Sequence, residues 1–120
     1  MIEPLDTAEV IRHFNDAFLQ HDPAALPQLV ADECVIENTT PAPNGSRHVG
    51  RAACLDVWQP LAANQETSFN LEEVDVHGER AVIFWRFRWG TGEEHSVRGV
   101  NLMRVRDGQI VEALGYAKTP

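Results

Sequence analysis

The second half of the chain consists of runs in which apolar and polar side chains alternate, a period of two that is typical of strands with one buried face. Two such runs, residues 97–105 and 109–117, flank Asp107-Gly108. Asp-Gly between alternating runs predicts a hairpin closed by a type I′ turn. Residues 68–76 and 80–89 form two earlier runs. The chain from residue 68 onward is therefore expected to be four consecutive strands.

The N-terminal part has helical spacing instead. Asp6 and Glu9 form a capping-box pattern at the start of a helix. The apolar positions of this helix fall on one face and are Val10, Phe14, Ala17 and Phe18. Pro23 is well placed to begin a second helix, but Pro27 removes an amide bond from it. The segment 24–30 is therefore predicted to be a short or kinked helix.

A strand and one more helix are predicted in the middle of the chain. From Glu33 onward the side chains alternate with the period of two that is typical of a strand. Cys34, Ile36 and Asn38 therefore share one face. Residues 40–46 have the composition of a loop. A helix follows Gly50, and its apolar positions are Cys54, Val57, Trp58 and Leu61. The order of elements predicts an α+β fold, in which one curved antiparallel sheet wraps around the helices.

Composition and charge limit the classes of protein to which this chain can belong. A chain of 120 residues with 43% hydrophobic and 23% charged residues is expected to form one globular domain. No run approaches the roughly 18 apolar residues of a membrane span, and the N-terminus lacks a signal-peptide pattern, so a cytoplasmic protein with no membrane partner is expected. The net charge of −8 is spread along the chain, which argues against nucleic acid as a partner.

Two groups of titratable residues have alternative interpretations. The five arginines that cluster in the strand region are Arg86, Arg88, Arg98, Arg104 and Arg106. They are expected either to pair with acidic neighbours on adjacent strands or to bind a carboxylate ligand. The acidic candidates are Glu72, Glu73, Glu93 and Glu94. The five histidines do not occur at the short spacings that are typical of metal ligands, such as H-x-x-x-H. We therefore expect no metal and no cofactor.

Several features occur together rarely: an Asp-Pro step before the second helix, a strand that ends in a polar residue, and the sequence VNLMRVRDGQIVEALGY at residues 100–116. With them the chain resembles the nuclear transport factor 2-like superfamily, and within it the ketosteroid isomerase-like and SnoaL-like polyketide cyclase groups. The resemblance implies one cone-like domain over residues 1–120. It says less about function, because isomerases, cyclases, dehydratases, epoxide hydrolases and proteins without catalytic activity all have this fold.

The resemblance also implies that the catalytic residues of the isomerases are replaced in this chain. It puts their carboxylate base at Asn38, their oxyanion-hole tyrosine at Phe14 and the partner aspartic acid at Asn101. An amide takes up no proton near neutral pH, and phenylalanine has no hydroxyl to donate. We therefore expect no ketosteroid isomerase activity by that mechanism. The Asp-Arg-Asp set of the related epoxide hydrolases cannot be assembled either.

The two asparagines remain candidates for ligand binding. If both point into an apolar cavity, their amides can orient a ligand carbonyl or hydroxyl group. Alternatively, they bond each other, water or nearby backbone and only satisfy the core. The pocket predicted from the sequence is lined by Phe14, Asn38, Trp58, Trp85, Phe87, Asn101 and Met103.

Three further residues are weaker candidates. His48 precedes a helix and either lies over a pocket mouth or sits in a surface loop. Glu37 would point away from the pocket unless a bulge turned it inward, where it would provide a base. Cys34 shares the inward face of Asn38, but no histidine is placed to activate it. Cys34 and Cys54 are expected to be small buried apolar residues without a disulfide.

Two functions from different classes are open at this point. The first is a small-molecule pocket protein of SnoaL-like type that takes a small apolar molecule; as an enzyme, the resemblance implies cofactor-free isomerase, cyclase, dehydratase or hydrolase chemistry. The second is a non-catalytic binding or dimerisation module whose cavity is filled by its own three tryptophans and five phenylalanines. A homodimer is expected under both. Its interface would be the outer sheet face with Val82, Phe84, Val100, Leu102, Leu114 and Tyr116.

Overall fold

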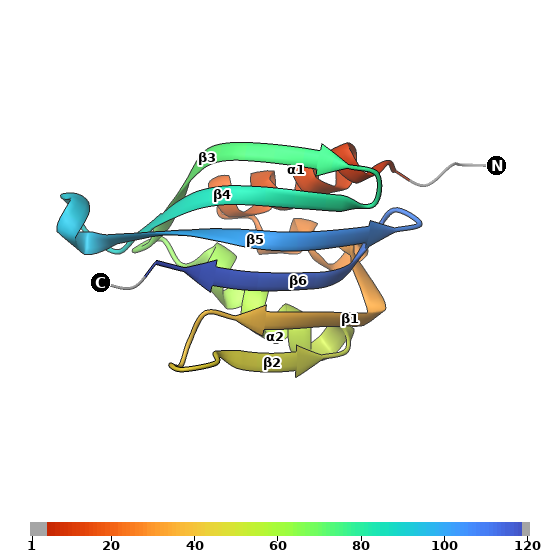
Figure 1. Ribbon diagram of the computed structural model, residues 1–120, viewed down its shortest axis with the longest axis horizontal. Coiled ribbons are helices and arrows are strands. Elements are labelled where there is room, and N and C mark those ends of the chain that lie inside the picture. The colour runs from red at the N-terminus through yellow and green to blue at the C-terminus, as the bar shows by residue number, and fades with distance from the viewer. Residues whose placement is uncertain (1–4, 119–120) are drawn as a thin grey trace.

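The structure is a computed structural model that describes residues 5–118. Its two α-helices and six strands are α1 (Thr7–Leu19), β1 (Val30–Asn38), β2 (Ser46–Val49), α2 (Arg51–Ala63), β3 (Ser68–His77), β4 (Arg80–Arg88), β5 (Ser96–Arg106) and β6 (Gln109–Ala117). Three single 3₁₀ turns join them, namely η1 (Pro23–Ala25), η2 (Pro27–Leu29) and η3 (Glu93–His95). Both α-helices lie on one face of the sheet, and the other face has no second layer in the described part of the chain (Figure 1). The predicted α+β class is confirmed.

The six strands form one curved, unclosed sheet in the order β2-β1-β6-β5-β4-β3. Neighbouring strands run antiparallel except β1 and β6, which pair in parallel. The expectation of a wholly antiparallel sheet is therefore wrong at this pair. These two strands are far apart in the sequence and no hairpin links them, so no local turn fixed their relative direction.

The two strongest local predictions are confirmed. The Glu9 backbone N–H donates to Asp6 Oδ1 at 2.9 Å, and the Asp6 N–H donates to Glu9 Oε1 at 3.3 Å, which completes the capping box of α1. Asp107 and Gly108 both have positive φ, 52° and 78°, as a type I′ turn requires. The strands β5 and β6 therefore meet in the expected hairpin.

The structure differs from the sequence prediction between α1 and α2. Residues 24–30 form the two turns η1 and η2 rather than one helix, and each turn begins with a proline. The strand β1 begins at Val30 instead of Glu33, and a register shift against β6 follows this residue. Strand β2 was not predicted, because four residues carry too little periodicity to be recognised. It pairs with the end of β1 and so holds Asn38 in place.

The main core lies between the helices and the concave face of the sheet. The residues on the predicted apolar face of α1 are buried there, together with Cys34, Cys54 and Trp58. Because α1 and α2 cover only part of the concave face, the remaining space forms a cavity. None of the helices within residues 5–118 is both long and apolar enough to cross a membrane.

Candidate functional site

A cavity of about 360 Å³ lies between α1, α2 and the concave face of the sheet. One side of it is an aromatic wall formed by Phe14, Phe18, Trp58, Phe69, Trp85 and Phe87. Phe14 contacts Trp58 with ring centroids 4.8 Å apart, and Phe18 contacts Phe69 at 5.6 Å. These edge-on contacts hold the rings against one another, so they line the cavity without filling it.

Trp89 extends this wall to the exposed end of the cavity. Its ring centroid lies 6.2 Å from that of Phe87, and 48% of the residue is exposed. It follows β4 at the base of the loop that contains η3, and its backbone N–H donates to the His95 carbonyl oxygen at 3.0 Å. The aromatic wall therefore runs from the buried face of helix α1 to the surface.

The polar end of the cavity is formed by three neighbouring strands. Asn101 of β5 pairs with Gly115 of β6, and the parallel register of Glu37 with Leu114 brings Asn38 of β1 beside Gly115. All three residues line the cavity. Because glycine has no side chain, the space between the two asparagines stays open. A Cβ atom at Gly115 would lie 3.4 Å from Asn101 Oδ1 and 3.4 Å from the Thr39 methyl group.

Each asparagine accepts one hydrogen bond from the protein. The indole Nε1–H of Trp85 donates to Asn101 Oδ1 at 3.1 Å. The Thr39 backbone N–H donates to Asn38 Oδ1 at 2.9 Å. The two amides do not bond each other, but Asn38 does bond nearby backbone, as one of the alternatives expected.

Gly99 lets Trp85 reach Asn101. Trp85 and Gly99 are register partners on β4 and β5, and the indole ring lies across the strand at this point. A Cβ atom at Gly99 would lie 2.4 Å from Trp85 Cη2 and 2.5 Å from the Tyr116 carbonyl oxygen. Both distances are shorter than any real Cβ contact, so only glycine fits here without rearrangement.

Six of the seven residues predicted to form the pocket line this one cavity; they are Phe14, Asn38, Trp58, Trp85, Phe87 and Asn101. Met103 is the exception. It lies on the inward face two positions after Asn101, but it is only 2% exposed and pairs with Ala81 and Ala113 in the core. Alternation predicts which face a side chain is on, but it gives no measure of how far the cavity extends along the strand.

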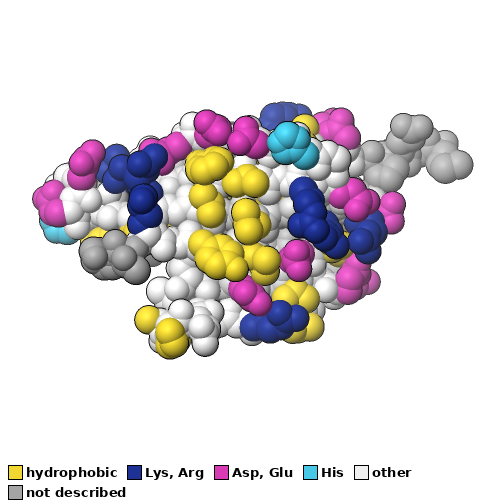
Figure 2. Space-filling model, viewed as in Figure 1, with side chains coloured by type: hydrophobic (Ala, Val, Ile, Leu, Met, Phe, Trp, Pro, Cys, Tyr) yellow, Lys and Arg dark blue, Asp and Glu magenta, His cyan; other side chains and the backbone are white. Residues whose placement is uncertain are grey.

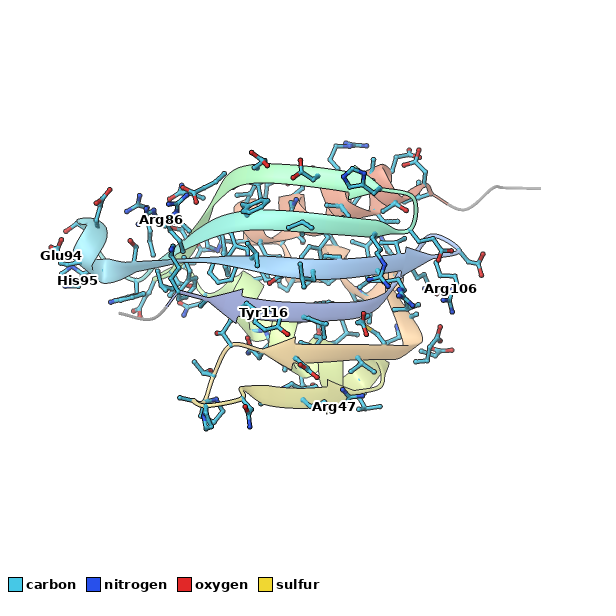
Figure 3. All side chains as sticks on the ribbon, in the orientation of Figure 1. Arg47, Arg86, Glu94, His95, Arg106 and Tyr116 are labelled. Carbon is cyan, nitrogen blue, oxygen red and sulfur yellow. The ribbon has the colours of Figure 1, made fainter. Side chains whose placement is uncertain are left out.

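The weaker candidates do not contribute a reactive group. Glu37 is the single titratable residue among the described lining residues, and its Oε2 accepts a hydrogen bond from Arg47 at 3.1 Å in an exposed ion pair. Glu37 and Arg47 are register partners on β1 and β2, and Figure 3 shows Arg47 on the uncovered side of the sheet. His48 Nε2 lies 3.0 Å from Ser46 Oγ and does not line the cavity.

The cysteines also lie outside the cavity. Both are free thiols with no exposed surface, and the Cys54 thiol donates to the Cys34 carbonyl oxygen at 3.3 Å. Burial raises the pKa of the Cys34 thiol far above its usual range, and the adjacent Cys54 raises it further. Burial also raises the pKa of Cys54. Both are therefore neutral thiols in the folded protein and are poor nucleophiles.

The arginines of β4 and β5 are not part of the site. Arg98 Nε donates to Glu72 Oε1 at 2.8 Å, which is the cross-strand pair expected for one of them. Arg86 donates to Ser96 Oγ at 2.8 Å, and Arg88 donates to Asn70 Oδ1. None of these three arginines lines the cavity. Within residues 5–118, no group of three or more His, Cys, Asp or Glu side chains is placed to hold a metal ion.

The sequence analysis missed the two glycines that shape the polar end of the cavity. Gly99 and Gly115 sit inside predicted strands, where an isolated glycine often marks a close approach of another group. That signal was present in the sequence. It could not show which side chain approaches, because the partners Trp85 and Asn38 belong to other strands.

Comparisons with known proteins agree with this architecture. A family model described as a SnoaL-like domain matches residues 11–113. The chain is similar to a crystal structure of an NTF2-like protein of unknown function from Mesorhizobium loti, with 59% identity, a TM-score of 0.87, and coverage of 94% of this chain and 91% of that one. The comparison with curated protein sequences gives no match.

Two more distant structures show the same fold. A candidate polyketide cyclase from Sinorhizobium meliloti has 22% identity and a TM-score of 0.72, with 89% of this chain and 93% of that one covered. A candidate ketosteroid isomerase from Kribbella flavida has 18% identity and a TM-score of 0.77, with 95% of this chain and 78% of that one covered. At these identities the likeness concerns the fold alone.

Proposed function

The chain belongs to the SnoaL-like domain family, and we propose that its cavity binds a compact, mostly apolar small molecule with its polar group at Asn38 and Asn101. The observation that carries the proposal is the cavity itself. It combines an aromatic wall with one polar end, which is the usual composition of a ligand site. The sequence resemblance to SnoaL-like and ketosteroid isomerase-like proteins is confirmed at the level of the family and the fold.

The size of the cavity favours this function over a self-filled module. Ligand pockets commonly have volumes of roughly 300 to 1,000 Å³. The cavity measures about 360 Å³ although the aromatic side chains already line it. A bicyclic molecule with one oxygen substituent is of suitable size.

The lining supports binding and orientation rather than proton transfer. Its one titratable side chain, Glu37, is paired with Arg47. Phe14, Asn38 and Asn101 share the cavity, and none of them exchanges a proton near neutral pH. In any reaction in this cavity, the asparagines therefore orient the substrate and do not act as acid or base.

A thermal-shift screen tests the proposed function. Purified protein is mixed with small aromatic and terpenoid ketones, epoxides and hydroxy acids. A ligand at 100 times its dissociation constant adds about 2.7 kcal/mol of stability, which is a shift of several degrees for a domain of this size. We expect at least one compound to give this shift, and we expect Asn38→Leu and Asn101→Leu to reduce it.

Asn64→Leu is the matched control, because Asn64 caps the end of α2 and does not line the cavity. It is expected to keep the full ligand-induced shift. If no compound stabilises the parent protein, or if all three variants respond as the parent does, binding at the polar end of this cavity is refuted.

We further propose that the uncovered sheet face forms a homodimer. Figure 2 shows an apolar group at the centre of this face with charged side chains on either side. Leu102 and Tyr116 belong to this group and are 39% and 55% exposed. Rows of opposite charge border it, with Arg98 paired to Glu72 at one end and Arg104 in register with Glu112 at the other. A face with balanced charge suits a second copy of itself.

Light scattering measures this association directly. The parent protein is expected to have the mass of a dimer at micromolar concentration, and Leu102→Lys the mass of a monomer. Val49→Lys is the control, because Val49 is a 63% exposed apolar residue on the edge strand β2, away from the central patch. A monomeric parent protein would contradict the proposed dimer.

A further inference from the structure

We propose that Asn15 is a second polar contact for the ligand, on the helix side of the cavity, and that it selects a neutral group with a donor beside an acceptor, such as a secondary lactam (a cyclic amide). This inference rests on the proposed function, since it concerns the same cavity. It adds a contact that is separate from Asn38 and Asn101, which lie on the sheet. The apolar face predicted for α1 does not include Asn15, so helical spacing did not point to it.

Asn15 is the one polar or charged residue that is buried within residues 5–118, and it is 8% exposed. It follows Phe14 in α1, and the two residues line the cavity together with Phe18 and Leu19 of the same helix. Positions 14, 15, 18 and 19 lie on one side of an α-helix. Asn15 is therefore on the side of α1 that borders the cavity, beside two phenylalanines of the aromatic wall.

The amide of Asn15 has no hydrogen-bond partner in the described part of the chain. The side-chain hydrogen bonds of α1 are those of its capping box, and within residues 5–118 none reaches Asn15. No side-chain nitrogen or oxygen atom of these residues is fully enclosed without a partner, so the amide borders open space. That space is the cavity that Asn15 lines. A ligand that displaces water from this amide has to replace the hydrogen bonds of that water.

Asn15 and the two strand asparagines border the cavity from different layers of the fold. Asn15 belongs to α1, whereas Asn38 and Asn101 belong to β1 and β5. Both α-helices lie on one face of the sheet, and the cavity lies between them and that face (Figure 1). The ligand therefore needs one polar group for the sheet and a second for α1, joined by an apolar ring system that suits the aromatic wall.

The chemistry of an amide decides which group suits Asn15. Its side chain has an acceptor, the oxygen, beside a donor, the N–H₂ group. A secondary lactam has N–H beside C=O along one edge, so the two groups can pair through two parallel hydrogen bonds. A ketone, ether or lactone at this point occupies only the donor and leaves the oxygen of Asn15 unpaired, which costs affinity. A charged group is disfavoured, because Glu37, the one titratable residue among the described lining residues, is already paired with Arg47.

Isothermal titration calorimetry with three bicyclic compounds of nearly equal size tests the inference. They are 4-methoxyquinolin-2-one, which has a lactam edge, 4-methoxycoumarin, in which a ring oxygen replaces the N–H, and 1-methoxynaphthalene, which has neither edge. We expect the parent protein to bind the lactam about tenfold more tightly than the lactone, the factor expected from one unpaired acceptor. In Asn15→Leu the lactam-to-lactone ratio is expected to fall to about one.

Asn101→Leu is the matched control, because it is the same substitution on the sheet side of the same cavity. It removes an amide proposed to meet the methoxy oxygen that all three compounds share, so it should weaken their binding by a similar factor. The tenfold ratio is expected to survive in Asn101→Leu. A ratio that is lost in Asn101→Leu and kept in Asn15→Leu would overturn the inference, because the lactam edge would then face the sheet.

A measurement without ligand tests the same residue independently. Leucine is a better helix former than asparagine and buries more apolar surface, and the substitution breaks no hydrogen bond within the described part of the chain. Asn15→Leu is therefore expected to raise the Tm of the free protein by several degrees. A fall in Tm would show that the amide is bonded within the protein and would refute its role toward a ligand.

The outcomes separate this inference from the proposed function. If the lactam and the lactone bind the parent protein equally well, the contact at Asn15 is refuted and the ligand cavity stands. The parent protein alone gives this answer, so it does not depend on a variant. If none of the three compounds binds, the lactam class is refuted, and the thermal-shift screen then decides whether the cavity binds any ligand.

Discussion

Gly99→Ala is the substitution for which the structure makes the sharpest quantitative prediction. The added Cβ atom would lie 2.4 Å from Trp85 Cη2 and 2.5 Å from the Tyr116 carbonyl oxygen. The indole is packed against Phe69, and the carbonyl belongs to the backbone of β6. Neither contact can therefore be relieved by a flexible side chain.

The expected cost has two parts. Overpacking a buried site destabilises a protein by about 1–3 kcal/mol. Moving the indole away also breaks its hydrogen bond to Asn101, which contributes about 1 kcal/mol more. We expect Gly99→Ala to lower the free energy of unfolding by about 2–4 kcal/mol, which corresponds to a fall in Tm on the order of 10 °C for a domain of this length.

Differential scanning calorimetry with Gly115→Ala as the control measures this cost. Gly115 is also an inward-facing glycine, on the neighbouring strand, but its added Cβ would meet its nearest atoms at 3.3–3.4 Å. Small shifts accommodate such contacts, so Gly115→Ala should change the stability by less than about 1 kcal/mol. If Gly99→Ala is as stable as Gly115→Ala, the described packing of Trp85 against β5 is wrong.

Two other predictions concern the stability of the fold. Asp6→Ala removes the side chain that accepts from the Glu9 N–H, so chemical denaturation should show a loss of about 1 kcal/mol, and no loss would argue against the capping box. The second concerns alkaline pH. The pKa of Cys34 is raised by burial, so above a pH of about 8.5 the unfolded chain releases a proton that the folded protein retains. Stability should therefore fall as the pH rises, by up to about 1.4 kcal/mol per pH unit, and urea midpoints of Cys34→Ala should show a shallower slope.

The sequence predicted those elements whose signals are local. The capping box of α1 and the type I′ turn at Asp107-Gly108 each depend on residues within one turn, and both are present. The parallel pairing of β1 with β6 and the short strand β2 depend on contacts between distant segments. No periodicity encodes such contacts, so these features were missed.

The candidate site was predictable in its members and less so in its arrangement. Alternation put Trp85 on the inward face, the resemblance singled out Asn38 and Asn101, and the structure places all three on the cavity. The same rule placed Met103 there, but that residue is enclosed by the core. The hydrogen bond from Trp85 to Asn101 joins two strands and depends on the missing side chain of Gly99, which only the packed structure reveals.

The central claim is that the side-chain amides of Asn38 and Asn101 meet the ligand. Their N–H₂ groups give separate signals in a ¹⁵N-correlated NMR spectrum, and each signal is assigned by its loss in Asn38→Leu or Asn101→Leu. Titration with acetonaphthone is predicted to shift both pairs of signals, whereas ethylnaphthalene should leave them nearly in place. If the ketone binds and shifts neither amide, the polar end of the cavity does not hold the ligand.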